Sequence, residues 1–349
     1  MKEINKIRIA AIIVTYNRKQ LLIECVERLV NQTYPPDSIF IIDNASTDGT
    51  MELLGEKGFV SRAPVSNKGC YESLTSIPSK ISEDKQIDVH YIRMSTNTGG
   101  SGGFCEGVKR GYEAGFDWLW LMDDDAEPDD VALLELTRHL NYRNVSALAS
   151  VVCSKKGISF GHRGLINYNN FFPLLQEPLS TSSYNDTLVE IDIASFVGIL
   201  INCHVVSSVG YPRKDFFIYH DDVEYCLRLR ERGKIFLVTK SRIFHKEEWA
   251  KVRRTINIFG FKSLRYPYTP LFYFKRRNVI WTVRKYINNG GLFYYRLTLS
   301  LIRDIICAIL FDDCKLRRMR LIALAYWHGL TSSFPQDSSK IKVQEILRL

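Results

Sequence analysis

The sequence Trp118-Leu119-Trp120-Leu121-Met122-Asp123-Asp124-Asp125 joins an apolar run to three consecutive aspartates. The apolar run predicts a buried strand, and the carboxylates then lie at the strand's carboxyl end, where α/β proteins bind ligands. Adjacent carboxylates raise one another's pKa values unless a positive partner lies among them. Mg²⁺ or Mn²⁺ is a suitable partner, because both prefer carboxylate oxygen and carry substrate phosphates. The alternative is a solvated acidic turn that caps the next helix.

Length and composition predict a folded chain with a sizeable core. The chain has 349 residues, of which 46% are hydrophobic and 24% are charged, so we expect one large domain, or one domain with an appendage. Residues 1–6 carry no apolar leader, and the eight cysteines show no CxxC pair. These features favour a cytoplasmic protein with reduced thiols.

Strands and helices alternate over the first 150 residues. Apolar runs predict strands, and apolar residues at i, i+3, i+4 spacing predict a helix after the first of them. Such βαβ repetition predicts a mostly parallel sheet flanked by helices. The predicted strands cover 7–15, 38–42, 89–94 and 118–122, with helices over 21–30 and from 97–103 onward, and an irregular insertion over 55–87.

The second half of the chain is less regular. Asp222 stands where a helix should begin, since Val223, Cys226 and Leu227 share one helical face. The predicted strands cover 146–152, 191–201, 235–239 and 243–245, with a polar segment over 157–188.

Polar residues at neighbouring strand ends indicate a ligand site. Thr15 and Asp43 end the first two strands, and Arg18 follows closely. A carboxylate suits a pyrimidine N–H or ribose hydroxyls, and arginine suits phosphate; for Asp43 alone, helix capping is the alternative. The glycines at 99, 100, 102 and 103 do not match the dinucleotide fingerprint. They allow close approach of a ligand at a helix N-terminus, or they serve a purely conformational purpose.

Asp221 and Asp222 form a second acidic centre about a hundred residues after the first. Metal-assisted glycosyl transfer needs two such centres, since a cation holds the leaving diphosphate and a free carboxylate accepts the proton of the attacking hydroxyl. His245, at the end of an apolar strand, is a candidate third metal ligand. The alternatives are a helix cap for Asp222 and a core histidine for His245.

Together these segments resemble an inverting family 2 glycosyltransferase with the GT-A fold over residues 7–250. The resemblance is carried by Ile12–Arg18, Ile42–Thr50, the three aspartates and Asp221–Arg228. Within that family, Asn97–Phe104 followed by Trp120–Asp125 looks most like bacterial galactofuranosyltransferases. The resemblance implies a Rossmann-like sheet in residues 1–250 and a helical extension over 251–349.

The same resemblance implies roles for individual residues. Asp222 falls on the catalytic base, and Asp221 becomes an acceptor contact, although the usual pair in the family is Glu-Asp. Asp123, Asp125 and His245 are expected to bind Mn²⁺ or Mg²⁺. Nucleotide-sugar binding is expected from Thr15, Arg18, Asp43, Gly99, Gly100, Asp123 and Asp124.

The resemblance thus implies a metal-dependent inverting hexosyltransferase that builds a cell-surface polysaccharide such as an O-antigen, capsule or cell wall. The expected donor is UDP-galactofuranose and the expected acceptor is a hydroxyl of a lipid-linked glycan. Because Tyr273–Asn278 is similar to a segment of rhamnosyltransferases, dTDP-rhamnose is the alternative donor. Two other classes stay open: a nucleotidyltransferase, although Thr15–Lys19 lacks the expected glycine, and a non-catalytic sugar- or membrane-binding module.

The last hundred residues are basic and aromatic, as in Lys251–Arg254 and Lys275–Arg277. This composition favours contact with an anionic membrane, at the inner face of the cytoplasmic membrane, over nucleic-acid binding. An ordinary packed tail or an oligomer contact is the alternative. Residues 291–311 are the most apolar, but Arg296, Arg303 and Asp304 interrupt them, which predicts an amphipathic rather than a spanning helix.

Overall fold

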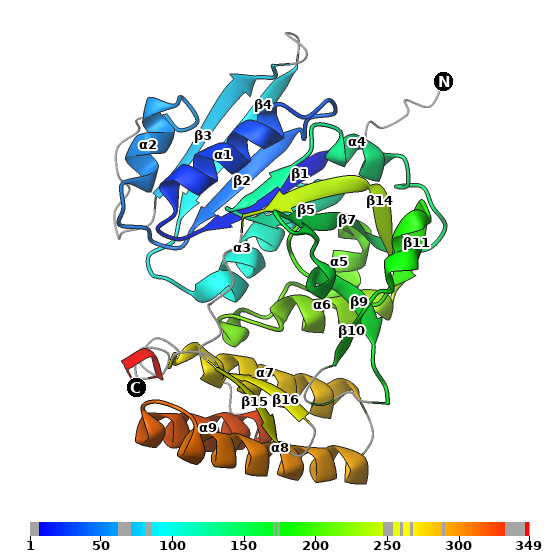
Figure 1. The fold of residues 1–349 in the computed structure, drawn as a ribbon. Helices are drawn as coiled ribbons and strands as arrows, with labels where there is room; N and C mark the ends of the chain where they lie inside the picture. Colours follow the sequence, from blue (N-terminus) through cyan, green and yellow to red (C-terminus); the bar gives the residue numbers. More distant parts are fainter. Residues whose placement is uncertain are drawn as a thin grey trace. The chain divides into compact units, whose positions relative to one another are not determined.

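The chain divides into two compact units (Figure 1). The first comprises residues 1–165, 178–217 and 221–246, and the second comprises 166–177, 218–220 and 247–349. The computed structural model describes residues 7–61, 71–80, 85–169, 172, 175–246, 254–258, 261–265, 268–287, 290–331 and 346–348. The functional division into 1–250 and 251–349 stays a prediction.

A large mixed sheet forms the centre of the first unit, in the order β11-β14-β7-β13-β5-β1-β2-β4-β3. Four adjacent strands are parallel, as predicted, and the register places Thr15 beside Asp43 and Val14 beside Asp123. Their carboxyl ends therefore meet at one edge. These strands are β1 (Ile9–Thr15), β2 (Ser38–Asp43), β4 (Gln86–Arg93) and β5 (Trp118–Asp123).

Both faces of the sheet are covered, which explains the unbroken apolar run of β1. Ile9, Ala11 and Ile13 contribute to one core cluster, whereas Ala10, Ile12 and Val14 contribute to the other. Residues of α1 and α4 pack in the first cluster, and residues of α3 and α6 pack in the second. The helices of this unit are α1 (Lys19–Val30), α2 (Thr50–Glu56), α3 (Gly99–Glu113), α4 (Ala132–Thr137), α5 (Cys203–Val209) and α6 (Asp221–Arg230).

Several segments differ from the sequence prediction. The expected insertion over 55–87 contains β3 (Tyr71–Pro78), an edge strand antiparallel to β4; its outer face is exposed, so its apolar pattern is weak. Residues 191–201 are not one strand, because the chain leaves the main sheet to pair with β9 before it returns. The pieces are β11 (Leu188–Ile191), β12 (Ile193–Ala194) and β13 (Ile199–Asn202).

Conversely, the two strands predicted over 235–245 are one strand, β14 (Lys234–His245), with a register shift between Val238 and Arg242 against β7 (Val145–Ser154). The polar segment 157–188 is not featureless either. Its short elements are β8 (Gly157–Ile158), η1 (Phe160–His162), β9 (Arg163–Ile166), β10 (Gln176–Pro178) and η2 (Thr181–Asn185). A further short strand, β6 (Ala126–Pro128), pairs with β14, and η3 (Lys214–Phe216) precedes α6.

The second unit is largely helical, as expected, but it also contains an antiparallel hairpin of β15 (Arg254–Ile258) and β16 (Phe261–Arg265). Its helices are α7 (Leu271–Tyr286), α8 (Gly290–Leu310) and α9 (Lys315–Thr331). Asp304 joins all three helices, because it pairs with Arg276 at 2.8 Å and accepts from Tyr326 Oη at 3.0 Å. Among the described residues, no helix is long and apolar enough to cross a membrane.

Candidate active site

The ends of β1 and β5 meet through direct hydrogen bonds. Thr15 Oγ1 donates to Asp124 Oδ2 at 2.7 Å. Arg18, in the loop before α1, donates through one nitrogen to Asp124 Oδ1 at 3.3 Å and to Asp125 Oδ2 at 3.1 Å. Because 53% of the Arg18 side chain stays exposed, its guanidinium also faces solvent beside the carboxylates. These contacts join Thr15 and Arg18 to Asp124 and Asp125 in one cluster; its role in nucleotide-sugar binding stays a prediction.

Asp123, Asp125 and His245 point to a common place. One ligand atom from each lies within 4.8 Å of the others. His245 reaches the triad because β14 pairs with β6, which places it opposite Ala126. Asp124 instead points toward Thr15. Because β5 ends at Asp123 and residues 124–125 form a turn, this difference in direction comes from the turn and not from a continuing strand.

The donor set of this triad fits a divalent ion. His245 Nε2 lies 2.9 Å from Asp125 Oδ1, yet that buried oxygen makes no well-formed hydrogen bond within the described residues. Around an octahedral ion with bonds of about 2.1 Å, neighbouring ligands are about 3 Å apart and opposite ones about 4 Å. Two carboxylates and an imidazole at such spacings suit Mn²⁺ or Mg²⁺.

Burial shapes the electrostatics of the triad. It raises the pKa of Asp123 to about 7, with a further increase from the charge of Asp125. It likewise raises the pKa of Asp124 to about 6, although Thr15 and Arg18 oppose the shift. For Asp125 burial acts in the same direction, but the contact with His245 outweighs it and lowers the pKa. The protein thus leaves negative charge here incompletely neutralised, as a cation site requires.

Asp221 and Asp222 begin α6, the second acidic centre. Burial raises the pKa of Asp221 to about 8, with a contribution from the charge of Asp222. Burial also raises the pKa of Asp222 to about 6. Asp222 Oδ1 accepts from the backbone N–H of Val223 at 2.7 Å, which leaves Oδ2 as the oxygen able to take a proton.

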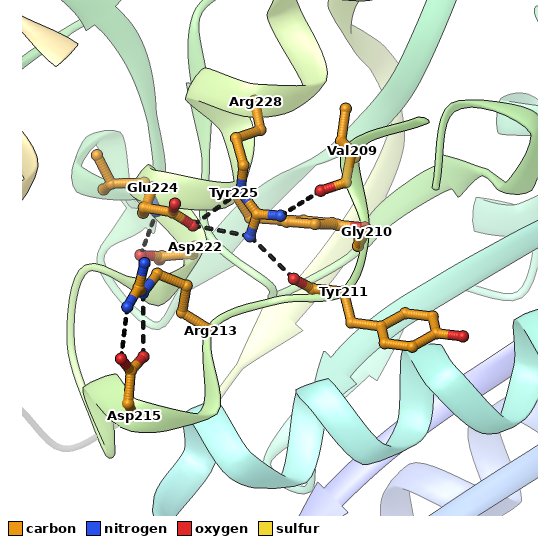
Figure 2. A network of polar contacts seen from close by, with 10 residues as sticks. Val209, Gly210, Tyr211, Arg213, Asp215, Asp222, Glu224, Tyr225 and Arg228 are labelled. Carbon is orange, nitrogen blue, oxygen red and sulfur yellow. Dashed lines mark hydrogen bonds and ion pairs between the residues drawn. The ribbon is translucent and has the colours of Figure 1, made fainter. Parts of the chain in front are cut away.

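A polar network fixes the helix that carries Asp222 (Figure 2). Arg228 pairs with Glu224 at 2.8 Å and donates to the carbonyls of Val209 at 2.6 Å and Tyr211 at 2.9 Å. Tyr225 Oη donates to the carbonyl of Gly210 at 3.0 Å. These bonds tie α6 to the segment after α5, so the position of Asp222 is set from outside the site.

Asp43 is engaged within the protein. Its buried carboxylate accepts from Tyr91 Oη at 2.6 Å and from the backbone of Ser46 at 2.7 Å. It therefore holds the turn after β2, and the next helix, α2, has Gly49 rather than Asp43 as its N-cap. A contact between Asp43 and a nucleotide stays a prediction.

The glycine-rich start of α3 serves packing at most positions. Gly99 has φ +73°, and a Cβ there would lie 2.0 Å from the Phe217 carbonyl oxygen. At Gly103 a Cβ would lie 2.4 Å from Val14 Cγ1, so α3 lies close to β1. Gly100 alone faces open space, with nothing within 4 Å of such a Cβ. The conformational interpretation holds for Gly99, and ligand contact at Gly100 stays a prediction.

Sequence reasoning missed His162 and Arg163, which lie in the polar segment 157–188. The His162 ring meets the His245 ring edge-on, with centroids 5.3 Å apart. Its Nδ1 lies 2.9 Å from Ser195 Oγ, which also accepts from Arg163 at 3.2 Å. No periodic pattern marks this segment; the one sequence signal is a histidine–arginine pair between two glycines.

Comparison with known sequences gives a concordant result. The profile of Glycosyl transferase family 2 matches residues 10–59 and 71–191. The chain is 28% identical over 232 residues to galactofuranosyltransferase GlfT1 of Mycolicibacterium smegmatis, covering 65% of this chain and 67% of that protein. Against GlfT1 of Mycobacterium tuberculosis the identity is 26% over 231 residues, 65% of this chain and 66% of that protein. The matched stretch thus spans about two thirds of each relative.

Solved structures with similar folds include GalNAc-T7 with UDP, GalNAc and Mn²⁺, at a TM-score of 0.56 and 13% identity, covering 95% of this chain and 59% of that one. Residues 1–349 of S. aureus TarS with UDP-GlcNAc superpose at a TM-score of 0.53 and 11% identity, covering 98% and 92%. At these identities the likeness shows the GT-A fold.

Proposed function

Because the chain belongs to glycosyl transferase family 2 and is a glycosyltransferase, we propose that it transfers a hexose from a UDP-linked donor, with inversion, to a hydroxyl of a lipid-linked glycan. The observation that carries this proposal is the pair of buried acidic centres. One holds an imidazole and an arginine among its carboxylates, and the other holds a carboxylate at a fixed helix start.

In this proposal Asp123, Asp125 and His245 hold the metal and Arg18 approaches the diphosphate. A bound Mn²⁺ or Mg²⁺ neutralises the charge that develops on the leaving nucleoside diphosphate. Thr15 and Arg18 keep Asp124 oriented in the same cluster. The half-exposed guanidinium of Arg18 can exchange part of its contact with the aspartates for the donor's phosphate oxygens.

Asp222 is the proposed general base. Its Oδ2 takes the proton of the acceptor hydroxyl while that oxygen bonds to the anomeric carbon and the bond to the diphosphate breaks. A positioned base contributes roughly 10²- to 10⁴-fold to such a rate. Since the pKa of Asp222 is raised only to about 6, the carboxylate is ionised near neutral pH and is a stronger base than an ordinary aspartate.

Galactofuranose is the proposed sugar, because the relatives that match over 65% of the chain are galactofuranosyltransferases. The competing rhamnose signal in Tyr273–Asn278 has a structural explanation. Asn278 donates to the carbonyls of Ile218 at 3.0 Å and Tyr219 at 2.8 Å, and accepts from Arg277 at 2.8 Å. These buried residues hold the backbone of the second unit in place. That structural role does not depend on which sugar the donor carries.

The second unit is the proposed membrane contact. Helix α8 exposes an apolar stripe at spacings of three, four and seven residues, made by Leu292, Tyr295, Leu299, Ile302 and Ile309. Exposed Lys315, Arg317 and Arg320 lie at the start of α9. The acidic residues of 290–331 are Asp304, Asp312 and Asp313, and each pairs with an arginine. An apolar stripe beside unopposed cations suits an anionic lipid surface at the cytoplasmic side.

A donor panel tests the proposal. The full chain with Mn²⁺ is incubated with UDP-galactofuranose, UDP-galactopyranose or dTDP-rhamnose and a synthetic lipid-linked acceptor, and both the glycolipid and the free nucleotide are measured. We expect transfer from UDP-galactofuranose and release of UDP. Transfer from dTDP-rhamnose alone would replace the donor assignment. Release of pyrophosphate from a nucleoside triphosphate would indicate a nucleotidyltransferase, and donor binding without turnover would indicate a binding module.

A further inference from the structure

Arg163 is a buried cation that the proposed reaction does not yet use. Its side chain is 1% exposed, and its nitrogens donate to the carbonyls of Ser150 at 2.8 Å, His162 at 2.8 Å and Val197 at 2.6 Å. Within the described residues no carboxylate lies within ion-pair distance of it. Burying a guanidinium without a paired anion costs free energy of folding. We therefore expect the charge of Arg163 to serve a function in its surroundings.

The β-structure connects Arg163 to the helix of Asp222. In the small sheet Arg163 pairs with Ala194. The thiol of Cys226 donates to the carbonyl of Ala194 at 3.3 Å and accepts from its N–H at 3.4 Å. Cys226 lies one turn after Asp222 on α6, so a strand pairing and a pair of hydrogen bonds connect the backbone at Arg163 to the first turns of α6. The electrostatic coupling agrees, since the charge of Arg163 lowers the pKa of Asp222 against burial.

We propose that Arg163 is a positioning residue for transfer: a fixed, non-contacting positive charge that keeps Asp222 ionised as the general base. The inference rests on the proposed role of Asp222. The cradle of carbonyls prevents the guanidinium from pairing directly with Asp222, so both Asp222 oxygens stay free of it. A direct ion pair would weaken the base, whereas a charge held at a distance favours the ionised form and leaves proton transfer unhindered.

The groups that face Asp222 in the described part of the first unit are few. Asp221 and Cys226 lie on the same helix and Arg163 lies on β9, while Asp123 at the end of β5 faces Asp221. Burial raises the pKa of Cys226 to about 12, so its thiol is neutral at assay pH. The positive charge of Arg163 therefore opposes the effect of burial on the pKa of Asp222.

The test is the pH profile of kcat/KM in Arg163→Gln and Arg163→Lys. Glutamine keeps two N–H donors for the carbonyls but has no charge. We therefore expect the acidic limb of the profile, where kcat/KM falls as Asp222 is protonated, to move to higher pH by about one unit. The loss of activity should be larger at pH 6 than at pH 8.5. Lysine keeps the charge, so its limb should stay at the wild-type position even if its rate falls. The same pair is measured in an Asp221→Asn background, because Asp221 titrates nearby.

Arg228→Met is the matched control, since Arg228 also donates to backbone carbonyls and fixes α6 (Figure 2). We expect a lower Tm and an unmoved limb. A limb that stays in place in Arg163→Gln overturns the proposal, and so does a limb that moves in Arg163→Lys. If Arg163→Gln does not fold, the position of the acidic limb in Arg163→Lys still tests the proposal. Failure of the proposed function itself would appear separately, as full activity in Asp222→Asn.

Discussion

The two acidic centres are both built from aspartates, but different groups compensate the buried negative charge in each. In Asp123–Asp125 the neutralising groups are in contact: His245 lies 2.9 Å and Arg18 3.1 Å from Asp125. In Asp221–Asp222 the cation whose charge acts on Asp222 is Arg163, which is held by backbone carbonyls, and the direct partner of Asp222 is a backbone N–H.

The difference fits the two chemical tasks that we propose for these centres. A metal site needs several ligand atoms directed to one point and a surplus of negative charge, which the first centre has. A general base needs a carboxylate oxygen that can accept a proton and a pKa raised toward 7, and Asp222 in the second centre has both.

The largest effect is expected for Asp222→Asn. Asparagine cannot accept the proton, so transfer should fall by roughly 10²- to 10⁴-fold, while affinity for the UDP-sugar stays within a few-fold because the base acts only in the transition state. Steady-state kinetics and calorimetric titration of the donor check this. Asp215→Asn, which removes a carboxylate paired with Arg213, is the control. Loss of donor binding with normal turnover of the bound donor would place Asp222 in the donor site instead.

Metal dependence comes next. Activity should disappear in EDTA and return with Mn²⁺ or Mg²⁺. Asp125→Ala should raise the metal concentration needed for half-maximal activity sharply, and His245→Ala less so, since a carboxylate contributes charge as well as a ligand atom. The exposed Asp129, just beyond β6, gives the control Asp129→Asn. Full activity in EDTA would mean that the three aspartates only cap the segment that follows.

A smaller effect concerns stability against pH. Asp221 has a folded-state pKa of about 8, above the ordinary unfolded value of about 4. The folded state therefore binds the proton more tightly, and ionisation destabilises it increasingly as pH rises between these two values. Asp221→Asn should melt several degrees higher than the wild type at pH 8.5, with the gain shrinking toward pH 5. Scanning calorimetry across this range checks the trend; a gain independent of pH would contradict the assignment.

The smallest effect should arise in the second unit. Reversing Arg317 and Arg320 to glutamate should weaken sedimentation with anionic vesicles at low salt, since each cation near such a surface contributes about 1 kcal/mol. Lys155→Glu/Lys156→Glu makes the same change in charge on exposed residues of the first unit and should have little effect. Equal losses in both variants would show a response to net charge alone, and the proposed contact through α8 and α9 would be wrong.

Local pattern determined much of the first unit from sequence alone. An apolar run such as Ile9–Thr15 is long enough to identify a buried strand, and parallel strands necessarily bring their carboxyl ends to one edge. Thr15, Arg18 and Asp43 could therefore be predicted to line one pocket at adjacent strand ends, and the family resemblance added the three aspartates to the same site. The helical spacing of the residues after Asp222 likewise predicted a helix that starts there, one residue after the observed start of α6 at Asp221.

Tertiary structure alone decided what lies against those carboxylates. His245 meets Asp125 across 120 positions of sequence because β14 crosses to pair with β6, and Arg163 reaches α6 because the chain breaks into β12 to pair with β9. Short strands of two to four residues carry too little periodicity to be recognised. Their pairing is selected by burial and hydrogen bonding over the whole sheet, which no local pattern records.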